Sequence, residues 1–159
     1  MLHDSSVHFT PALTAQEQVI IDSAKCILAG HLNTNPVVSS WHALLDYCAV
    51  SVRHDAVEVF HVLLLDKKNR LLADVRMATG TIDHVPVYPR EVVRLAIQHN
   101  ASAIILAHNH PSGDPAPSKQ DIAMTKDVQA ACQILGITLH DHIITGADKS
   151  LSMRATGVL

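Results

Sequence analysis

The sequence contains few aromatic and few charged residues. Phe, Trp and Tyr make up 3% of the 159 residues, and Lys, Arg, Asp and Glu together make up 17%. Lys and Arg number 12 against 15 for Asp and Glu, which gives a net charge of −3 with His neutral. Nucleic-acid-binding domains usually carry a basic stripe, and single-strand binders add aromatic side chains for base stacking. The composition therefore argues against direct nucleic-acid binding.

Membrane and secretion signals are also missing from the sequence. No apolar run approaches the ~20 residues that cross a bilayer, and the N-terminus lacks the basic start and apolar centre of a signal peptide. The cysteines are Cys26, Cys48 and Cys132, each among apolar residues. An odd number of widely spaced cysteines predicts buried free thiols in a reducing compartment rather than disulfides. We therefore expect a cytoplasmic protein that does not bind a membrane.

The apolar content favours one folded domain. Apolar residues make up 48% of the chain, which is enough for an ordinary hydrophobic core. Residues 1–13 are predicted to be a flexible leader, residues 14–56 a short helical extension, and residues 57–159 the main domain. Apolar edge strands in the main domain are compatible with a homodimer.

Two helices are predicted in the extension. Thr14 and Glu17 form a capping box, and Gly30 is typical of the residue that follows a helix end. A second helix is expected between a cap at residues 39–40 and about Val52. The apolar stripe of the first helix, which is expected to be buried, consists of Val19, Ile20, Ala24, Ile27 and Leu28.

Apolar segments separated by turn signals predict an α/β fold for the main domain. Strands are expected over 57–66, 71–77, 103–107, 137–145 and 150–154, and helices over 88–99 and 118–135. The inner faces of these helices are expected to carry Val92, Val93, Ala96 and Ile97 in the first, and Ile122, Val128, Cys132 and Leu135 in the second. The first two strands are expected to form an antiparallel hairpin. The expected architecture is a mixed, largely antiparallel sheet flanked by helices.

Residues 104–125 contain the strongest candidate site. His108 and His110 stand at the end of a buried strand, where side chains two residues apart point to the same side. After a proline-rich loop, Ser118 is typical of a helix N-cap, which places Asp121 in the first turn. Two imidazoles and a carboxylate suit a catalytic zinc, which usually takes three protein ligands and leaves one position for water.

Other interpretations of these residues are open. Ser118 and Asp121 also come close to a capping box, which stabilises a helix start by about 1 kcal/mol without a metal. With 12 His in the chain, H-x-H pairs arise by chance, and His140 and His142 form such a pair inside an apolar strand. Asp114 is an alternative carboxylate ligand, although its place before a proline is that of an ordinary turn residue.

The spacing of His108, His110, Ser118 and Asp121 matches H-x-H-x7-S-x2-D, the JAMM motif of the JAB/MPN metallopeptidases. The wider sequence over 57–157 resembles the bacterial RadC-like branch of that superfamily, in the segments GTID (80–83), VYPREVV (87–93) and LAHNHPSGDP (106–115). This resemblance implies the three-layer MPN, or cytidine deaminase-like, architecture. It also implies a zinc metallopeptidase that hydrolyses peptide or isopeptide bonds, with one Zn²⁺ per chain held by the two histidines and the aspartate.

The same resemblance implies a catalytic role for Glu58. Its carboxylate heads an otherwise apolar strand, where burial costs free energy unless the group is paired or has a task; alternatively, it faces water at the strand end. The sequence alone does not select Glu58 over Glu91 or Asp83, but the family places its water-activating glutamate in such a strand. By resemblance, the Ser118 hydroxyl polarises the carbonyl of the substrate.

Three functions are compatible with the sequence. The first, which we take as the prediction, is a zinc metallopeptidase acting on a peptide or protein substrate. The second is a catalytically silent RadC-like accessory domain associated with DNA repair or genome maintenance. The third is an iron oxygenase, because two histidines and one carboxylate also bind non-haem iron. The Ser118 position and the lack of a cosubstrate-binding signature argue against the third function.

Overall fold

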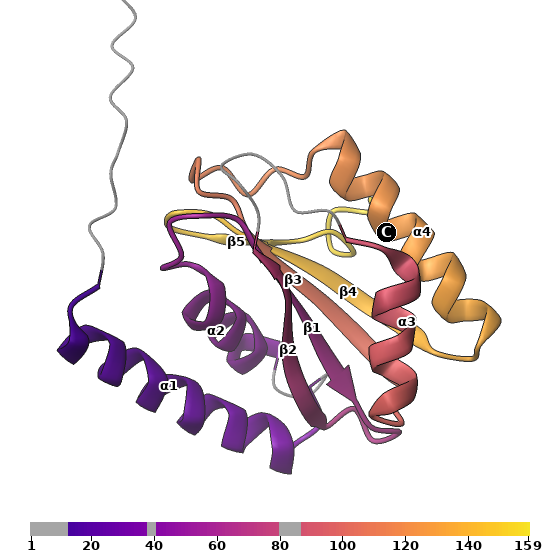
Figure 1. The fold of residues 1–159 in the computed structure, drawn as a ribbon, viewed down its shortest axis with the longest axis horizontal. Coiled ribbons are helices and arrows are strands. Elements are labelled where there is room, and N and C mark those ends of the chain that lie inside the picture. The colour runs from indigo at the N-terminus through magenta and orange to yellow at the C-terminus, as the bar shows by residue number, and fades with distance from the viewer. Residues whose placement is uncertain (1–12, 38–40, 80–86) are drawn as a thin grey trace, which may run out of the picture.

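The order of elements along the chain follows the alternation expected from the sequence. The structure is a computed structural model that describes residues 13–37, 41–79 and 87–159. Within these ranges the elements are α1 (Ala15–Thr34), α2 (Trp41–Val52), β1 (Val59–Leu65), β2 (Leu71–Thr79), α3 (Pro89–Gln98), β3 (Ala103–Asn109), α4 (Lys119–Ile134), β4 (Thr138–Thr145) and β5 (Ser150–Ser152). The strands form one sheet in the order β2-β1-β3-β4-β5, in which β3 and β4 pair in parallel and the other neighbours pair antiparallel (Figure 1). The predicted mixed, largely antiparallel sheet is confirmed.

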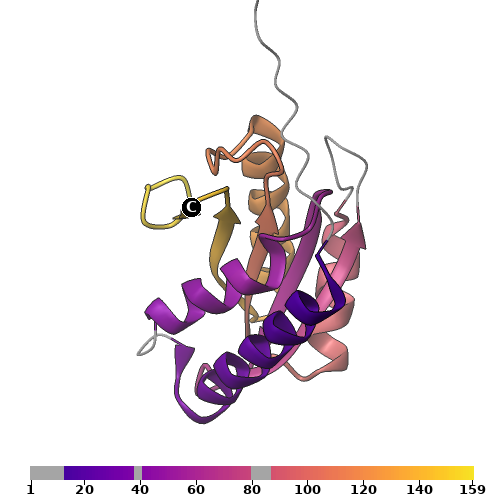
Figure 2. The same ribbon diagram turned by 90° about the vertical axis from the view of Figure 1, so that its left-hand side faces the viewer.

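Helices cover both faces of this sheet. α1 and α2 lie on one face, and α3 and α4 lie on the other, as Figure 1 and Figure 2 show from two directions. The predicted three-layer α/β architecture is therefore confirmed. Among the described residues, none of the helices combines the length and the apolar character that crossing a bilayer would require.

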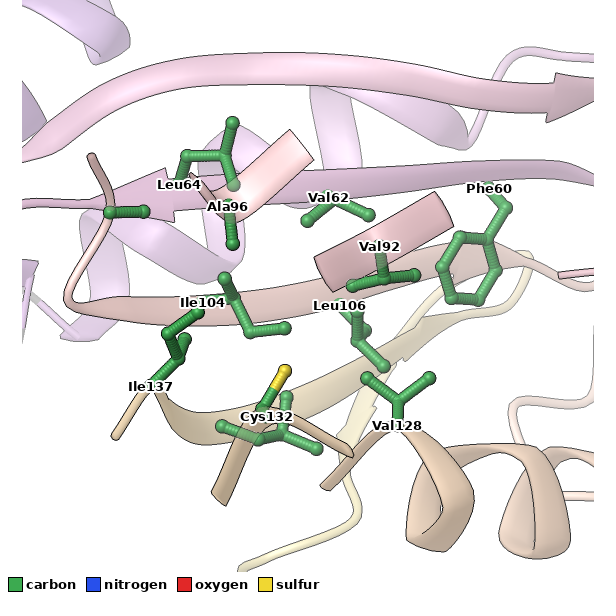
Figure 3. Packing of buried hydrophobic residues seen from close by; sticks show 12 residues of the cluster. Phe60, Val62, Leu64, Val92, Ala96, Ile104, Leu106, Val128, Cys132 and Ile137 are labelled. Carbon is green, nitrogen blue, oxygen red and sulfur yellow. The ribbon is translucent and has the colours of Figure 1, made fainter. Parts of the chain in front are cut away.

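The face of the sheet beneath α3 and α4 holds a hydrophobic core (Figure 3). Its residues on β1 and β3 alternate along each strand, and they are Phe60, Val62, Leu64, Ile104 and Leu106. The helices cover them with Val92 and Ala96 of α3 and with Val128 and Cys132 of α4. Phe60 pairs with His108 across the β1–β3 ladder. The core face therefore runs directly into the candidate site at the end of β3.

The opposite face joins α2 to the sheet through a second core and a polar cluster. The Tyr47 hydroxyl of α2 donates to Asp74 Oδ2 at 2.7 Å, and His61 Nδ1 lies 2.7 Å from Asp74 Oδ1. Burial and the neighbouring Asp74 carboxylate raise the pKa of Tyr47, so its hydroxyl keeps the proton that this bond needs. Asp74 therefore ties α2 and β1 to β2.

The predicted end of α1 is wrong. The capping box at Thr14 is present as expected, but the helix continues past Gly30 to Thr34 and has Asn35 as its C-cap. A proline disfavours helical backbone in the residue before it. Because Pro36 follows the cap, this proline rather than the glycine sets the end of the helix.

The predicted buried stripe of α1 is also largely wrong. Val19, Ile20 and Ile27 are 64%, 62% and 64% exposed, whereas Leu32 in the last turn is buried. Apolar residues lie all around this helix, so its periodicity did not identify the side that packs. Cys26 is exposed as well, although Cys48 and Cys132 are buried free thiols as expected.

The predicted inner faces of α3 and α4 are confirmed at their centres and wrong near their C-terminal ends, while Val93 and Ile122 are partly buried. The central residues Val92, Ala96, Val128 and Cys132 are buried. Ile97 and Leu135 are 56% and 51% exposed. Ile97 follows a buried alanine by one residue, which is a rotation of about 100° around the helix. Leu135 is already the C-cap of α4 and no longer follows the helical stripe.

Three expectations from the sequence fall outside the described residues. They concern the leader at 1–13, of which Leu13 alone is described, the helix cap at 39–40, and the alternative acid Asp83.

Candidate metal centre

The candidate site lies where β3 ends and α4 begins. β3 is buried along its length and carries His108 near its end, with no exposed surface. The chain leaves the sheet after Asn109 and enters α4 at its N-cap, Ser118. Ser118 Oγ accepts from the Asp121 N–H, and Asp121 Oδ2 accepts from the Ser118 N–H, so the predicted capping box is present. The box fixes Asp121 in the first turn of α4.

The three predicted ligands come together in space. Nε2 of His108 lies 2.9 Å from Nε2 of His110. Asp121 Oδ1 lies 3.5 Å from the former nitrogen, and Oδ2 lies 3.4 Å from the latter. A tetrahedral zinc with bonds of about 2.0–2.2 Å places its ligand atoms about 3.3–3.5 Å apart. The two distances to the carboxylate lie in this range, whereas the two nitrogens are closer together, so binding of an ion requires the rings to move slightly apart. The cluster can hold one ion.

The ionisation of His108 and Asp121 suits metal binding. Burial lowers the pKa of His108 to about 4, so its ring is neutral near pH 7. Burial by itself raises the pKa of Asp121, but hydrogen bonds from His110 and Ser118 and the nearby His108 ring outweigh it, and the net pKa is lowered. A neutral imidazole and an ionised carboxylate are the forms that bind a metal.

His110 is held from both sides. Its hydrogen bond with Asp121 raises its pKa, against the opposing effect of burial. On the other side, His110 Nδ1 lies 2.8 Å from the carbonyl oxygen of Asp114. Because a carbonyl oxygen only accepts, Nδ1 carries a proton and Nε2 is directed to the cluster. The Asp114 carboxylate accepts from the Ala116 N–H in a turn, so this residue supports His110 through its backbone.

The protein without bound metal is expected to lose stability as the pH falls from about 6.5 towards 4. The pKa of His108 is lowered from 6.5 to about 4, so the unfolded chain takes up this proton first. Burial also lowers the pKa of His142, which adds to the loss of stability at low pH. The His108 contribution alone amounts to about 3 kcal/mol.

The contribution of His110 to stability has the opposite dependence on pH and changes over a different pH range. Because its pKa is raised above 6.5, its contribution is complete below pH 6.5 and is lost as the pH rises through the folded value. Urea unfolding at a series of pH values, in the presence of a chelator, measures both effects. A free energy of unfolding that stays constant between pH 6.5 and 4.5 would contradict the burial of the two neutral rings.

Glu58 lies across the sheet from His110. The β1–β3 register pairs Phe60 with His108, and its continuation places Glu58 opposite His110, just beyond the last paired residues. The negative charge of Glu58 contributes to the raised pKa of His110, so the carboxylate is within electrostatic range of the cluster. Glu91, the alternative acid, forms ion pairs with arginines on α3 instead.

Asn109 holds the chain on both sides of Glu58. Its Oδ1 accepts from the Val59 N–H at 2.8 Å, and its Nδ2 donates to the carbonyl oxygens of Asp55 and Val57 at 3.1 Å each. The residue is 2% exposed, so the hydrogen bond to Val59 is shielded from water and the other two are partly shielded. This residue was not predicted from the sequence, because its partners lie 50 to 54 positions earlier in the chain.

His142 was also missed as part of the site. In the H-x-H pair interpreted as chance, His140 turns away, with Nε2 at 2.7 Å from Asn69 Oδ1. His142 Nε2 instead lies 2.7 Å from His108 Nδ1. β3, α4 and β4 form a parallel crossover, and β4 pairs with β3. In a parallel crossover, the strand that follows the helix often pairs with the strand that precedes it. Applied to the sequence, this tendency would have placed the strand of His142 next to the strand of His108.

Ser118 contacts the cluster through the carboxylate of Asp121. Its hydroxyl donates to Asp121 Oδ2 at 2.6 Å, and its side chain is exposed at the start of α4. The same Oδ2 accepts from the Ser118 N–H at 2.7 Å. One carboxylate therefore caps the helix and faces both histidines.

The fold and the cluster together define a class, the three-layer α/β domains with two histidines and one aspartate at a strand end. The chain belongs to the RadC-like JAB domain family, whose sequence profile matches residues 38–158. The match includes α2, while the predicted domain boundary at residue 57 stays a prediction.

Curated relatives agree with this assignment. The chain is 54% identical over 145 residues to a UPF0758 protein of Rhodobacter capsulatus, which covers 91% of the chain and 68% of that relative. It is 51% identical over 148 residues to a UPF0758 protein of Ruegeria pomeroyi, which covers 93% of the chain and 66% of that relative. The matches thus span about two-thirds of the relatives' own length.

Proposed function

We propose that this domain is a zinc-dependent metallopeptidase that hydrolyses a peptide or isopeptide bond and binds one zinc per chain. The observation that carries the proposal is the convergence of His108, His110 and Asp121, with Glu58 across the sheet from them. Two nitrogen ligands and one oxygen ligand form the set of hydrolytic zinc sites that keep a fourth position open. Membership of the RadC-like JAB family supports the same activity.

The side chains around the cluster have separate tasks in this reaction. When bound, zinc supplies a Lewis acid and lowers the pKa of a coordinated water to about 7. Glu58 accepts a proton from the attacking water and then donates it to the leaving amine nitrogen. The Ser118 hydroxyl turns from Asp121 Oδ2 to the carbonyl oxygen of the scissile bond, where negative charge develops.

Metal removal and reconstitution test this proposal. Protein stripped with a chelator is expected to take up one zinc per chain, and to cleave members of a broad peptide library when zinc is restored. His108→Ala is expected to lose both properties, whereas His54→Ala, which changes an exposed histidine, is expected to keep them.

Each other outcome has a distinct meaning. Cleavage by the metal-stripped protein would contradict a zinc mechanism. Zinc uptake without cleavage of any peptide would favour the catalytically silent accessory domain. Redox-active iron in place of zinc in aerobically purified protein would favour the oxygenase interpretation.

A further inference from the structure

A row of hydrogen bonds runs from the ring of His108 to α4. His108 Nδ1 lies 2.7 Å from His142 Nε2, and His142 Nδ1 lies 2.7 Å from Thr125 Oγ1. Thr125 Oγ1 lies 2.5 Å from the carbonyl oxygen of Asp121. The row therefore begins and ends at candidate metal ligands, because Asp121 offers its carboxylate to the cluster and its carbonyl to Thr125.

The direction of each hydrogen bond in the row follows from its last member. A carbonyl oxygen only accepts, so the single hydrogen of the Thr125 hydroxyl points to Asp121. The hydroxyl oxygen then accepts from His142, which places the proton of that neutral ring on Nδ1. His142 Nε2 must in turn accept from His108 Nδ1. The one proton of the neutral His108 ring is thus on Nδ1, and the Nε2 lone pair faces the cluster.

Burial protects the row from competing partners. His108, His142 and Thr125 have no exposed surface. The Phe60 ring stacks on His108 with centroids 5.9 Å apart and meets His142 edge-on at 5.5 Å. Met153 Sδ, 3.8 Å from Thr125 Oγ1, is a much weaker acceptor than the carbonyl oxygen. Water therefore does not substitute for a missing member unless the core opens.

We infer that Thr125 and His142 are positioning residues that select the metal-binding tautomer of His108. On the other side of the cluster, the Asp114 carbonyl oxygen accepts from His110 Nδ1, so the Nε2 atom of His110 also faces the cluster. The two Nε2 atoms then face each other at 2.9 Å, beside a carboxylate. Without a metal ion, a proton on His110 Nε2 is shared with His108 Nε2 and the Asp121 carboxylate, and a bound metal ion takes the place of that proton. The inference rests on the proposed zinc site, but it concerns bonds within the chain.

Zinc affinity of two matched variants tests this inference. Thr125→Val removes the hydroxyl and keeps the branched shape, and its zinc Kd, measured by competition with a coloured chelator, is expected to rise about 10–100-fold. Thr125→Ser keeps the hydroxyl and is expected to restore nearly full affinity. Val128→Ala trims the same buried side of α4 and is expected to lower the melting temperature without changing the zinc Kd.

The tautomer itself gives a readout that does not depend on zinc. In ¹⁵N NMR spectra of metal-stripped wild-type protein, His108 is expected to carry its proton on Nδ1. In Thr125→Val, His142 no longer has an acceptor for Nδ1–H and can donate from Nε2 instead. His108 is then expected to populate the Nε2–H form, which loss of packing alone would not produce.

Several results would overturn the inference. These are an unchanged zinc Kd and tautomer in folded Thr125→Val, or an equal loss of affinity in Thr125→Ser. Should Thr125→Val not fold, His142→Leu tests the same step and is expected to show the same loss of zinc affinity. If wild-type protein binds no zinc, the proposed function fails, while the tautomers of wild type and Thr125→Val still decide the role of the row.

Discussion

Glu58→Gln is expected to lower the rate of peptide hydrolysis about 10²–10⁴-fold, which is the usual contribution of a general acid–base residue. Glutamine keeps the size of the side chain but cannot accept and return a proton. Because Glu58 is outside the cluster of His108, His110 and Asp121, the variant is expected to keep one zinc per chain. Initial rates on a peptide selected from the library, together with metal analysis of the same sample, measure both effects.

Glu91→Gln is the matched control for this experiment. Glu91 is a glutamate in the first turn of α3 that pairs with Arg94, and its replacement is expected to leave the rate unchanged. Cleavage that survives Glu58→Gln would remove Glu58 from the mechanism, even with zinc bound. Loss of zinc in that variant would instead identify Glu58 as a ligand.

Asn109→Ala is expected to lower the free energy of unfolding by about 2–4 kcal/mol, since it leaves one buried and two partly buried backbone groups without their partner. These groups are the Val59 N–H and the carbonyls of Asp55 and Val57. They flank Glu58, so hydrolysis is expected to fall further than zinc affinity. Urea unfolding with an unchanged m-value measures the loss of stability.

An exposed asparagine provides the control for this second prediction. Asn33→Ala, on the outside of α1, is expected to change the free energy of unfolding by less than about 0.5 kcal/mol. A loss below about 1 kcal/mol in Asn109→Ala would show that water satisfies the three backbone groups. Asp55 and Val57 would then be less buried in solution than the structure places them.

The convergence of His108, His110 and Asp121 could be predicted because its determinants are local. His108 and His110 share a side through the two-residue period of a strand, and Ser118 caps the helix that presents Asp121. Each of these relations joins residues no more than three positions apart, so propensity and spacing are sufficient to identify them. The link between β3 and α4 needed the family motif, because no local rule sets the path of the loop between them.

The supporting residues could not be predicted in the same way because their partners are remote in sequence. His142 contacts a residue 34 positions away, and Asn109 contacts residues at least 50 positions away. Such pairs depend on the strand order, which periodicity does not determine. For α1, the sequence showed a helix but not the side that packs, since Val19 and Ile20 are exposed while Leu32 is buried.

The double use of the Asp121 carboxylate restricts which residue types can stand at this position as the third ligand of the proposed metal site. Ser118 donates both its N–H and its hydroxyl to Oδ2 of this residue. A histidine or a cysteine can bind zinc, but neither offers an oxygen that accepts these two bonds. The capping box at the start of α4 therefore favours an oxygen acceptor at position 121, so the residue that begins the helix also limits which kinds of ligand the proposed metal site can present.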